Sequence, residues 1–188
     1  GKGLDFFIPE KEEIPARQLP DTLHNGYVAY AIGGKHETKK MPREMIANLC
    51  QKINAPVALL GDQFDYDNGQ WIKEHSNNAI NLCGTYNLFG SASVVKHASL
   101  VISHDTGLMH IATALKKDIL SLWGNTIPEF GMYPYKAGEN SRIFEVSDLR
   151  CRPCSKIGFK KCPKTHFKCM KEQDINEIAE YANTILKV

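Results

Sequence analysis

Residues 100–110 read Leu100-Val101-Ile102-Ser103-His104-Asp105-Thr106-Gly107-Leu108-Met109-His110. The first three are apolar, as in a short buried strand, and four polar residues separate them from a glycine. From about residue 107 to 115 the apolar side chains recur at helical spacing. The segment therefore predicts a strand, a polar turn and a helix, in that order.

The same order recurs along the chain. We expect strands at 27–32, 57–60, 80–83, 100–102, 119–123 and 142–146. We expect helices at about 42–53, 69–75, 88–98, 107–115 and 174–186. In the last of these, Asp174 is predicted as the N-cap and Glu177 as the second half of a capping box. Short apolar strands that alternate with helices indicate βαβ units, so the predicted fold class is α/β, a mainly parallel sheet flanked by helices.

Composition narrows the class of protein. The chain has 188 residues, of which 43% are hydrophobic and 23% charged, as in an ordinary globular domain. Its net charge of +2 gives no support for nucleic acid or a membrane surface as a partner. Neither a 20-residue apolar run nor an N-terminal signal segment is present, so we expect a soluble, cytoplasmic protein.

The turn at 103–110 has the chemistry of a phosphate site. Ligands of parallel sheets bind outside the carboxyl ends of the strands, and free N–H groups at a helix start attract anions. Gly107 permits close approach, Thr106 can donate a hydrogen bond, and His110 could reach a phosphate oxygen. Asp105 only accepts, which suits sugar hydroxyls. The alternative is that Asp105 or Thr106 simply caps the helix.

Two motifs here resemble a known family. Residues 105–112 (DTGLMHIA) followed by 123–126 (WGNT) are similar to glycosyltransferase family 9, the ADP-heptose:lipopolysaccharide heptosyltransferases. Lys39-Lys40-Met41-Pro42 resembles the family's K-x-W-P signature, with Met41 in place of tryptophan. The cysteine-containing segments 151–154 and 162–170 also resemble the tail of many members. The resemblance covers about residues 27–170.

The resemblance implies an architecture and a reaction. Family members are inverting GT-B enzymes with two Rossmann-like domains, of which the C-terminal one binds the nucleotide-sugar donor. We expect this chain to be that domain, with 1–26 as the interdomain connection and 27–188 as the donor-binding domain, including the Cys-rich loop 151–169 and the C-terminal helix. The N-terminal acceptor domain and its general base would be missing, so the isolated chain should bind donor but transfer poorly or not at all. The acceptor would be a lipid-linked oligosaccharide, handled at the inner face of the inner membrane, with peripheral membrane contact.

The resemblance also implies residue roles. Lys39 would supply the catalytic cation for the leaving diphosphate, without a metal cofactor. Asp65 would bind the ribose. The remaining donor-binding residues would contact phosphates, sugar or base: Gly33, Gly34, Gly84, Thr85, Asp105, Thr106, Gly107 and His110. Alternatives remain for several of them, because Lys39 and Lys40 could be solvated surface charges, Asp65 an ordinary loop residue and His110 a helix histidine with no ligand.

Four cysteines lie close together in the sequence. Cys151, Cys154, Cys162 and Cys169 have the spacing C-x2-C-x7-C-x6-C. They could complete a structural zinc site, or they could be reduced or partly oxidised thiols. The lysines between them form a basic loop. This loop could face the acceptor or the missing domain, or its lysines could simply be solvated.

Two other functions fit less well. A different nucleotide-binding enzyme, such as a dinucleotide-dependent dehydrogenase, is disfavoured because no G-x-G-x-x-G turn follows the first strand. A zinc-bound nucleic-acid or interaction module built on the cysteines is disfavoured by the near-neutral charge.

Overall fold

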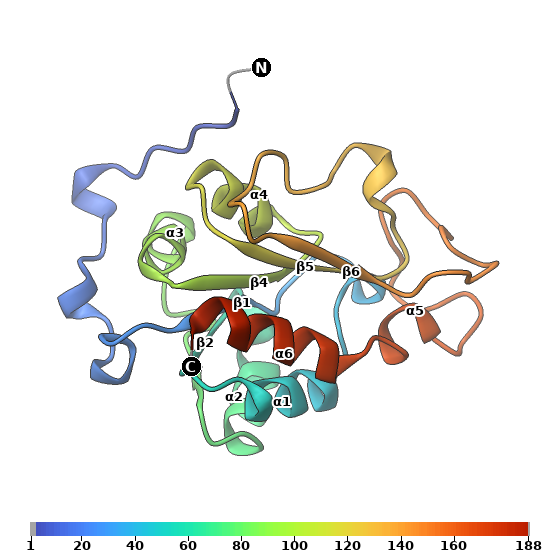
Figure 1. Cartoon of the computed structure of the whole chain (residues 1–188), viewed down its shortest axis with the longest axis horizontal. Helices are drawn as coiled ribbons and strands as arrows, with labels where there is room; N and C mark the ends of the chain where they lie inside the picture. Colours follow the sequence, from blue (N-terminus) through green and yellow to red (C-terminus); the bar gives the residue numbers. More distant parts are fainter. Residues whose placement is uncertain (1–2, 188) are drawn as a thin grey trace.

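The chain folds around one parallel sheet, seen in a computed structural model that describes residues 3–187 (Figure 1). The strands are β1 (Val28–Ala31), β2 (Val57–Leu60), β3 (Ala79–Asn81), β4 (Leu100–His104), β5 (Ile119–Trp123) and β6 (Arg142–Glu145). The α-helices are α1 (Arg43–Lys52), α2 (Tyr66–Glu74), α3 (Leu88–His97), α4 (Gly107–Ala114), α5 (Lys168–Lys171) and α6 (Ile175–Leu186). Short 3-10 helices are η1 (Glu10–Glu12), η2 (Ala16–Gln18), η3 (Asp21–Leu23), η4 (Glu37–Lys39), η5 (Gln63–Asp65) and η6 (Pro128–Phe130).

The strand order is β3-β2-β1-β4-β5-β6, and every neighbouring pair is parallel. The predicted α/β class is therefore confirmed, and the order is that of a Rossmann-like sheet. The order in which successive strands are added to the sheet reverses between β1 and β4. In such sheets the residues that follow those two strands face the ligand.

Two layers of helices enclose the sheet. Helices α1, α2 and α6 cover one face, and α3 and α4 cover the other (Figure 1). Successive side chains of a strand point to opposite faces. Val28 and Tyr30 accordingly pack with the α1 and α6 side, whereas Tyr27 and Ala29 pack with the α3 and α4 side. All four are almost completely buried, which explains why this strand reads as a continuous apolar run.

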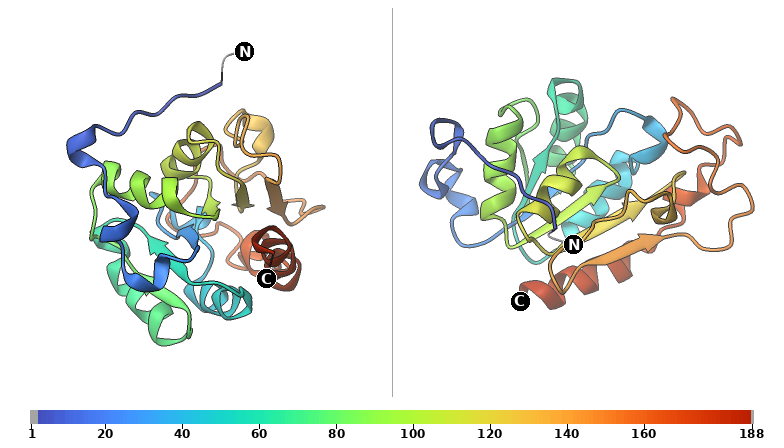
Figure 2. Two further views of the ribbon diagram at one scale, coloured as in Figure 1. Left: turned by 60° about the vertical axis from the view of Figure 1, so that its left-hand side comes forward. Right: turned by 90° about the horizontal axis from the view of Figure 1, so that it is seen from above.

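The N-terminal segment runs along the α3 side of the sheet (Figure 2). The Ile14 N–H donates to Ser93 Oγ at 3.1 Å, and Leu19 and Leu23 are buried in the core beneath α3. Although the segment is predicted as a connection, these two leucines are part of the core of the domain. The role of residues 1–26 as an interdomain connection stays a prediction.

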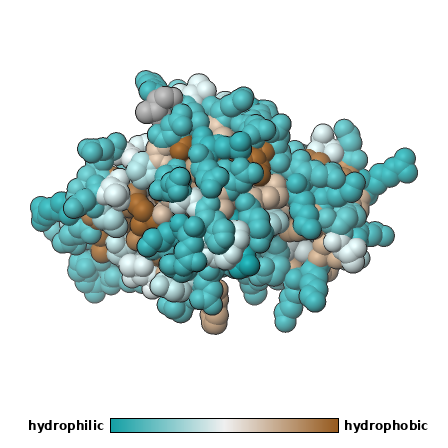
Figure 3. Space-filling model, turned by 90° about the horizontal axis from the view of Figure 1, so that it is seen from below, coloured by the Kyte–Doolittle hydropathy of each residue, from teal (hydrophilic) through white to brown (hydrophobic). Residues whose placement is uncertain are grey.

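The C-terminal helix begins as predicted. The Asp174 carboxylate accepts hydrogen bonds from the N–H groups of Asn176 and Glu177. The Glu177 carboxylate does not complete a capping box, because it pairs with Arg142 of β6. No helix among residues 3–187 is long and apolar enough to cross a membrane. Hydrophilic side chains cover most of the face seen from below, with small apolar patches between them (Figure 3).

Candidate functional site

A cavity of about 850 Å³ lies at the carboxyl ends of β1 and β2 and the start of α4. Its volume suits a small-molecule or nucleotide ligand. Five of the predicted donor-binding residues line it: Gly33, Gly34, Asp65, Thr106 and Gly107. The structure therefore brings together residues from three separate loops at the place where α/β sheets bind ligands.

The start of α4 is open toward a ligand. Thr106 is its N-cap, and the Thr106 side chain makes no capping hydrogen bond but lies 3.2 Å from the hydroxyl of Ser103. The alternative in which the Thr106 side chain caps the helix is therefore wrong. A Cβ built at Gly107 would meet nothing within 4 Å. The first-turn N–H groups and the helix dipole are thus available to an anion.

Beside the cavity, Lys39 and Asp105 form a buried ion pair. The Lys39 ammonium lies 2.6 Å from Asp105 Oδ2, and the Thr126 hydroxyl donates to the same oxygen at 3.0 Å. The two charged side chains are 13% and 6% exposed, so the alternative of a solvated Lys39 is wrong. Both contacts involve Oδ2 of Asp105, and neither involves Oδ1.

Lys40 is a second cation at the site, and the sequence assigned it no function. Its side chain lines the cavity, is 14% exposed and contacts Glu37 at 2.6 Å and Asp65 at 3.6 Å. The alternative of a solvated surface charge is therefore wrong for Lys40 as well. The only sequence signal was its position next to Lys39.

Asp65 is built into the wall of the cavity. Its carboxylate accepts a hydrogen bond from the N–H of Asp62 at 3.1 Å, within a capping box of η5. Burial raises the pKa of this carboxyl, and the charge of Lys40 opposes that rise. A Cβ at Gly33 would come within 2.3 Å of Asp65 Oδ2. Gly33 therefore makes room for the aspartate, whatever it does for a phosphate.

Two buried residues hold the segment that carries the lysines. Thr38 is 2% exposed, and its hydroxyl both accepts from the Phe159 N–H at 2.8 Å and donates to the Phe159 carbonyl at 3.2 Å. The Met41 N–H donates to His104 Nε2 at 3.1 Å. The lysines thus lie between two anchored positions, and neither contact had a signal in the sequence.

His104 accepts the Met41 N–H inside the core. Burial lowers the pKa of His104 to about 3, with the charge of Lys40 as a smaller cause. The imidazole is therefore neutral at neutral pH, as its acceptor role requires.

Lys39 and Asp105 are not part of the cavity lining, and three further predicted residues lie away from it. Gly84 has a φ of +70°, which favours glycine, and it packs on Gln63. Thr85 is exposed beside it, and His110 is partly buried on the first turn of α4. None of the three lines the cavity.

Other cavity residues are ones the sequence did not single out. Phe64 is 93% exposed and Leu88 is 55% exposed, and both line the cavity with Tyr86. Such apolar side chains at a cavity mouth can stack on a planar ring.

The Asn125 side chain lacks a hydrogen-bond partner among the described residues, although it is 1% exposed.

The cysteine cluster does not form a metal site in the part of the chain that is described. All of its cysteines are free thiols, and no group of three or more His, Cys, Asp or Glu side chains there is arranged to hold a metal ion. The alternative of a structural zinc site is therefore not supported. Arg152 fixes the loop, because its guanidinium donates to the Gly124 carbonyl at 2.6 Å and the Thr126 carbonyl at 2.9 Å.

Comparisons with known proteins identify the family. The model of glycosyltransferase family 9 (heptosyltransferase) matches residues 8–165. Lipooligosaccharide heptosyltransferase 2 of Campylobacter jejuni is 30% identical over 118 residues, which are 63% of this chain and 35% of the relative. The chain spans well under two thirds of that relative's length.

Solved structures share the fold. A family 9 glycosyl transferase from Veillonella parvula superposes with a TM-score of 0.78 at 23% identity, over 99% of this chain and 54% of the other. The E. coli ADP-heptose lps heptosyltransferase II gives a TM-score of 0.72 at 18% identity, over 97% of this chain and 53% of the other. With the family model matching most of its length, this chain belongs to glycosyltransferase family 9.

Proposed function

We propose that this chain is the donor-binding half of an inverting GT-B heptosyltransferase. It binds a nucleotide-diphospho-sugar of the ADP-heptose type, and the heptose passes to a lipopolysaccharide core-type acceptor. The acceptor and the general base come from an N-terminal domain, and the reaction takes place at the cytoplasmic face of the inner membrane. By itself the chain binds donor and transfers little or no sugar.

The observation that carries the proposal is the set formed by Lys39, Asp105 and Thr126 beside the open start of α4. In the transfer, an acceptor hydroxyl oxygen forms a bond to the anomeric carbon. The bond from that carbon to the diphosphate oxygen breaks, and its electron pair leaves with the diphosphate. A general base on the N-terminal domain takes the hydroxyl proton.

The residues of this chain would act on the leaving group. Negative charge grows on the diphosphate, and fixed donors and cations stabilise it without reorganisation. The N–H groups of Gly107 and the next residues supply donors. The Lys39 ammonium has three protons, so it can maintain its ion pair with Asp105 and also donate a hydrogen bond to the diphosphate. Lys40 adds a second positive charge at the cavity wall.

The rest of the cavity suits the nucleoside and the sugar. Asp65 offers a carboxylate to the ribose hydroxyls, and Phe64 and Tyr86 offer faces to the base. The free oxygen of Asp105 accepts from the heptose hydroxyls. The name of the E. coli structural relative, which includes ADP-heptose, supports the choice of donor.

Titration calorimetry with ADP-heptose, ADP, NAD and a DNA oligomer tests the proposal. We expect binding of the two ADP ligands, and Asp105→Ala should abolish the preference for ADP-heptose over ADP. Thr113→Ser on α4, away from the cavity, is the matched control. Tighter binding of NAD or DNA than of ADP, or an unchanged preference in Asp105→Ala, would refute the assignment.

A further inference from the structure

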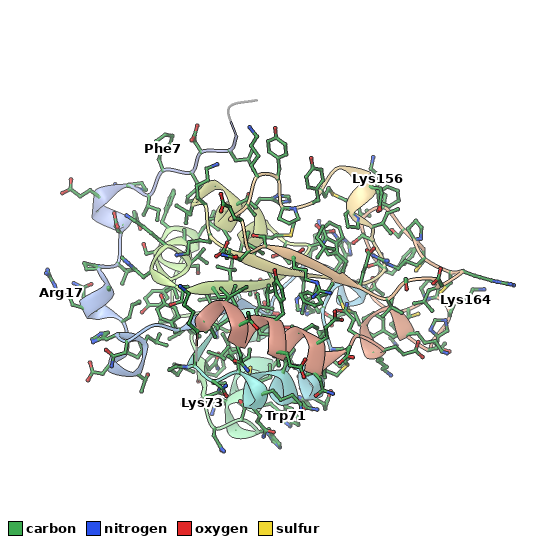
Figure 4. All side chains as sticks on the ribbon, viewed as in Figure 1. Phe7, Arg17, Trp71, Lys73, Lys156 and Lys164 are labelled. Atoms are coloured by element: carbon green, nitrogen blue, oxygen red, sulfur yellow. The ribbon has the colours of Figure 1, made fainter. Side chains whose placement is uncertain are left out.

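One segment of this chain carries a positive charge that the donor site does not use. Residues 149–171 contain eight Lys and Arg residues and no Asp or Glu. Because the whole chain has a net charge of only +2, the remainder is net negative. The positive charge is thus concentrated at one end of the molecule, where Figure 4 shows Lys156 and Lys164 far from Arg17 and Lys73.

Two apolar side chains project from the same segment. Ile157 is 62% exposed and Phe159 is 38% exposed. They alternate with Gly158 between exposed lysines at 156, 160 and 161. The loop thus combines two exposed apolar side chains with three exposed lysines within six residues.

The backbone of the loop is held by contacts with residues 36 and 38, so Ile157 and Phe159 remain at the surface. Phe159 is bonded through its N–H and carbonyl to the buried Thr38 hydroxyl. Gly158 has a φ of +114° and packs closely on His36, where a Cβ would come within 2.6 Å. The main chain of the loop is therefore held against residues 36–38, which directly precede Lys39.

We propose that the loop 155–161 docks on an anionic lipid surface, with Ile157 and Phe159 inserted among the head groups and Lys156, Lys160 and Lys161 against the phosphates. Lysines next to apolar side chains at the tip of a loop suit this interface, because the apolar atoms enter it while the ammonium groups stay at the phosphate level. A protein partner would need an equally acidic face, whereas the cytoplasmic leaflet supplies anionic charge over its whole surface.

The biological role of this docking rests on the proposed function, in which the acceptor is lipid-linked. Phe159 is bonded to Thr38, the residue before Lys39. Docking of the loop would thus hold the lysine segment at a fixed distance from the surface that delivers the acceptor.

Co-sedimentation with vesicles tests the proposal. The chain should bind vesicles containing phosphatidylglycerol and not vesicles of phosphatidylcholine alone, and binding should fall with added salt. Each lysine near such a surface strengthens binding by about fivefold. The triple variant Lys156→Gln, Lys160→Gln, Lys161→Gln should therefore bind on the order of 100-fold more weakly, and Ile157→Ser with Phe159→Ser should also weaken binding.

Matched variants control for bulk charge and apolar exposure. Lys11→Gln, Lys52→Gln, Lys73→Gln removes the same charge elsewhere, and Phe7→Ser removes an apolar side chain that is 84% exposed. Both should bind vesicles as the unchanged chain does. Equal loss in the control triple, or no binding to anionic vesicles, would overturn the proposal. ADP-heptose calorimetry on the same variants separates this result from the donor site, because the loop variants should keep donor affinity.

Discussion

The Lys39 ammonium lies 2.6 Å from Asp105 Oδ2, and this ion pair joins the loop after β1 to the loop after β4. These are the two strands between which the sheet reverses its order. The pair therefore connects the two loops at the switch point of the sheet. Because both side chains are largely buried, the pair contributes to the stability of the fold, and variants can separate that contribution from the proposed role in donor binding.

Removing one partner should destabilise the fold more than removing both. Lys39→Met or Asp105→Asn alone leaves a buried polar or charged group without its partner, which costs about 3 kcal/mol of unfolding free energy. The double variant should recover most of that loss. Urea unfolding of the four proteins measures the coupling.

The double variant should still fail to bind ADP-heptose, because the cation and the carboxylate are both gone. Donor affinity that returns together with stability would mean that the pair has only a structural role.

The hydroxyl of Thr38 should hold the basic loop in place. Thr38→Val removes both hydroxyl contacts to Phe159 but keeps the size of the side chain. We expect a loss of about 1–2 kcal/mol in unfolding free energy, the usual cost of a buried hydrogen-bond partner. Trypsin should also cleave faster after Lys160 and Lys161, since the loop opens more often.

Thr38→Ser keeps the hydroxyl and is the control. It should resist trypsin nearly as well as the unchanged chain, and equal cleavage in the valine and serine variants would show that the hydroxyl does not hold the loop.

Strands buried on both faces are well predicted from this sequence. The predicted limits of 57–60 and 119–123 are those of β2 and β5, because the apolar run has the length of the strand and polar residues follow it at once. The positions of Thr106 and Gly107 at the cavity could be predicted for the same reason, since they lie where a strand is followed by a helix.

Contacts between distant residues had no such signal. Thr38 and Phe159 are separated by 121 positions, and each is an ordinary residue in its local sequence. The sequence did not indicate that Lys40 lines the cavity while Lys39 pairs with Asp105, because the directions of adjacent side chains depend on the turn of η4. The spacing of the four cysteines left both a zinc site and free thiols open, because spacing alone does not determine where the side chains point.

Stability should fall in mild acid because of His104. Its pKa is about 3 in the folded chain and about 6.5 when unfolded, so the unfolded state binds the proton first as the pH drops. The stabilisation is complete above about pH 6.5 and is lost progressively as the pH falls toward 3. At about pH 4.5 the loss should be about 2–3 kcal/mol.

His104→Gln removes this titration and keeps an acceptor for the Met41 N–H. Urea unfolding at about pH 7 and about pH 4.5 should show a smaller acid loss in the variant than in the unchanged chain, by about 2–3 kcal/mol. Equal losses in both proteins would show that His104 is not the group responsible.

Gly107 tests the phosphate site without disturbing the fold. A Cβ there meets no protein atom within 4 Å, and alanine favours a helix over glycine, so Gly107→Ala should leave the unfolding free energy unchanged or raise it by up to about 1 kcal/mol. If the diphosphate lies against the first turn of α4, the added methyl group pushes it from the N–H groups. Affinity for ADP should then fall by about tenfold or more, the worth of a hydrogen bond to a charged group. Adenosine has no phosphate and should bind both proteins equally in the same calorimetry. An equal loss for adenosine and ADP, or no loss for ADP, would place the phosphates away from this helix.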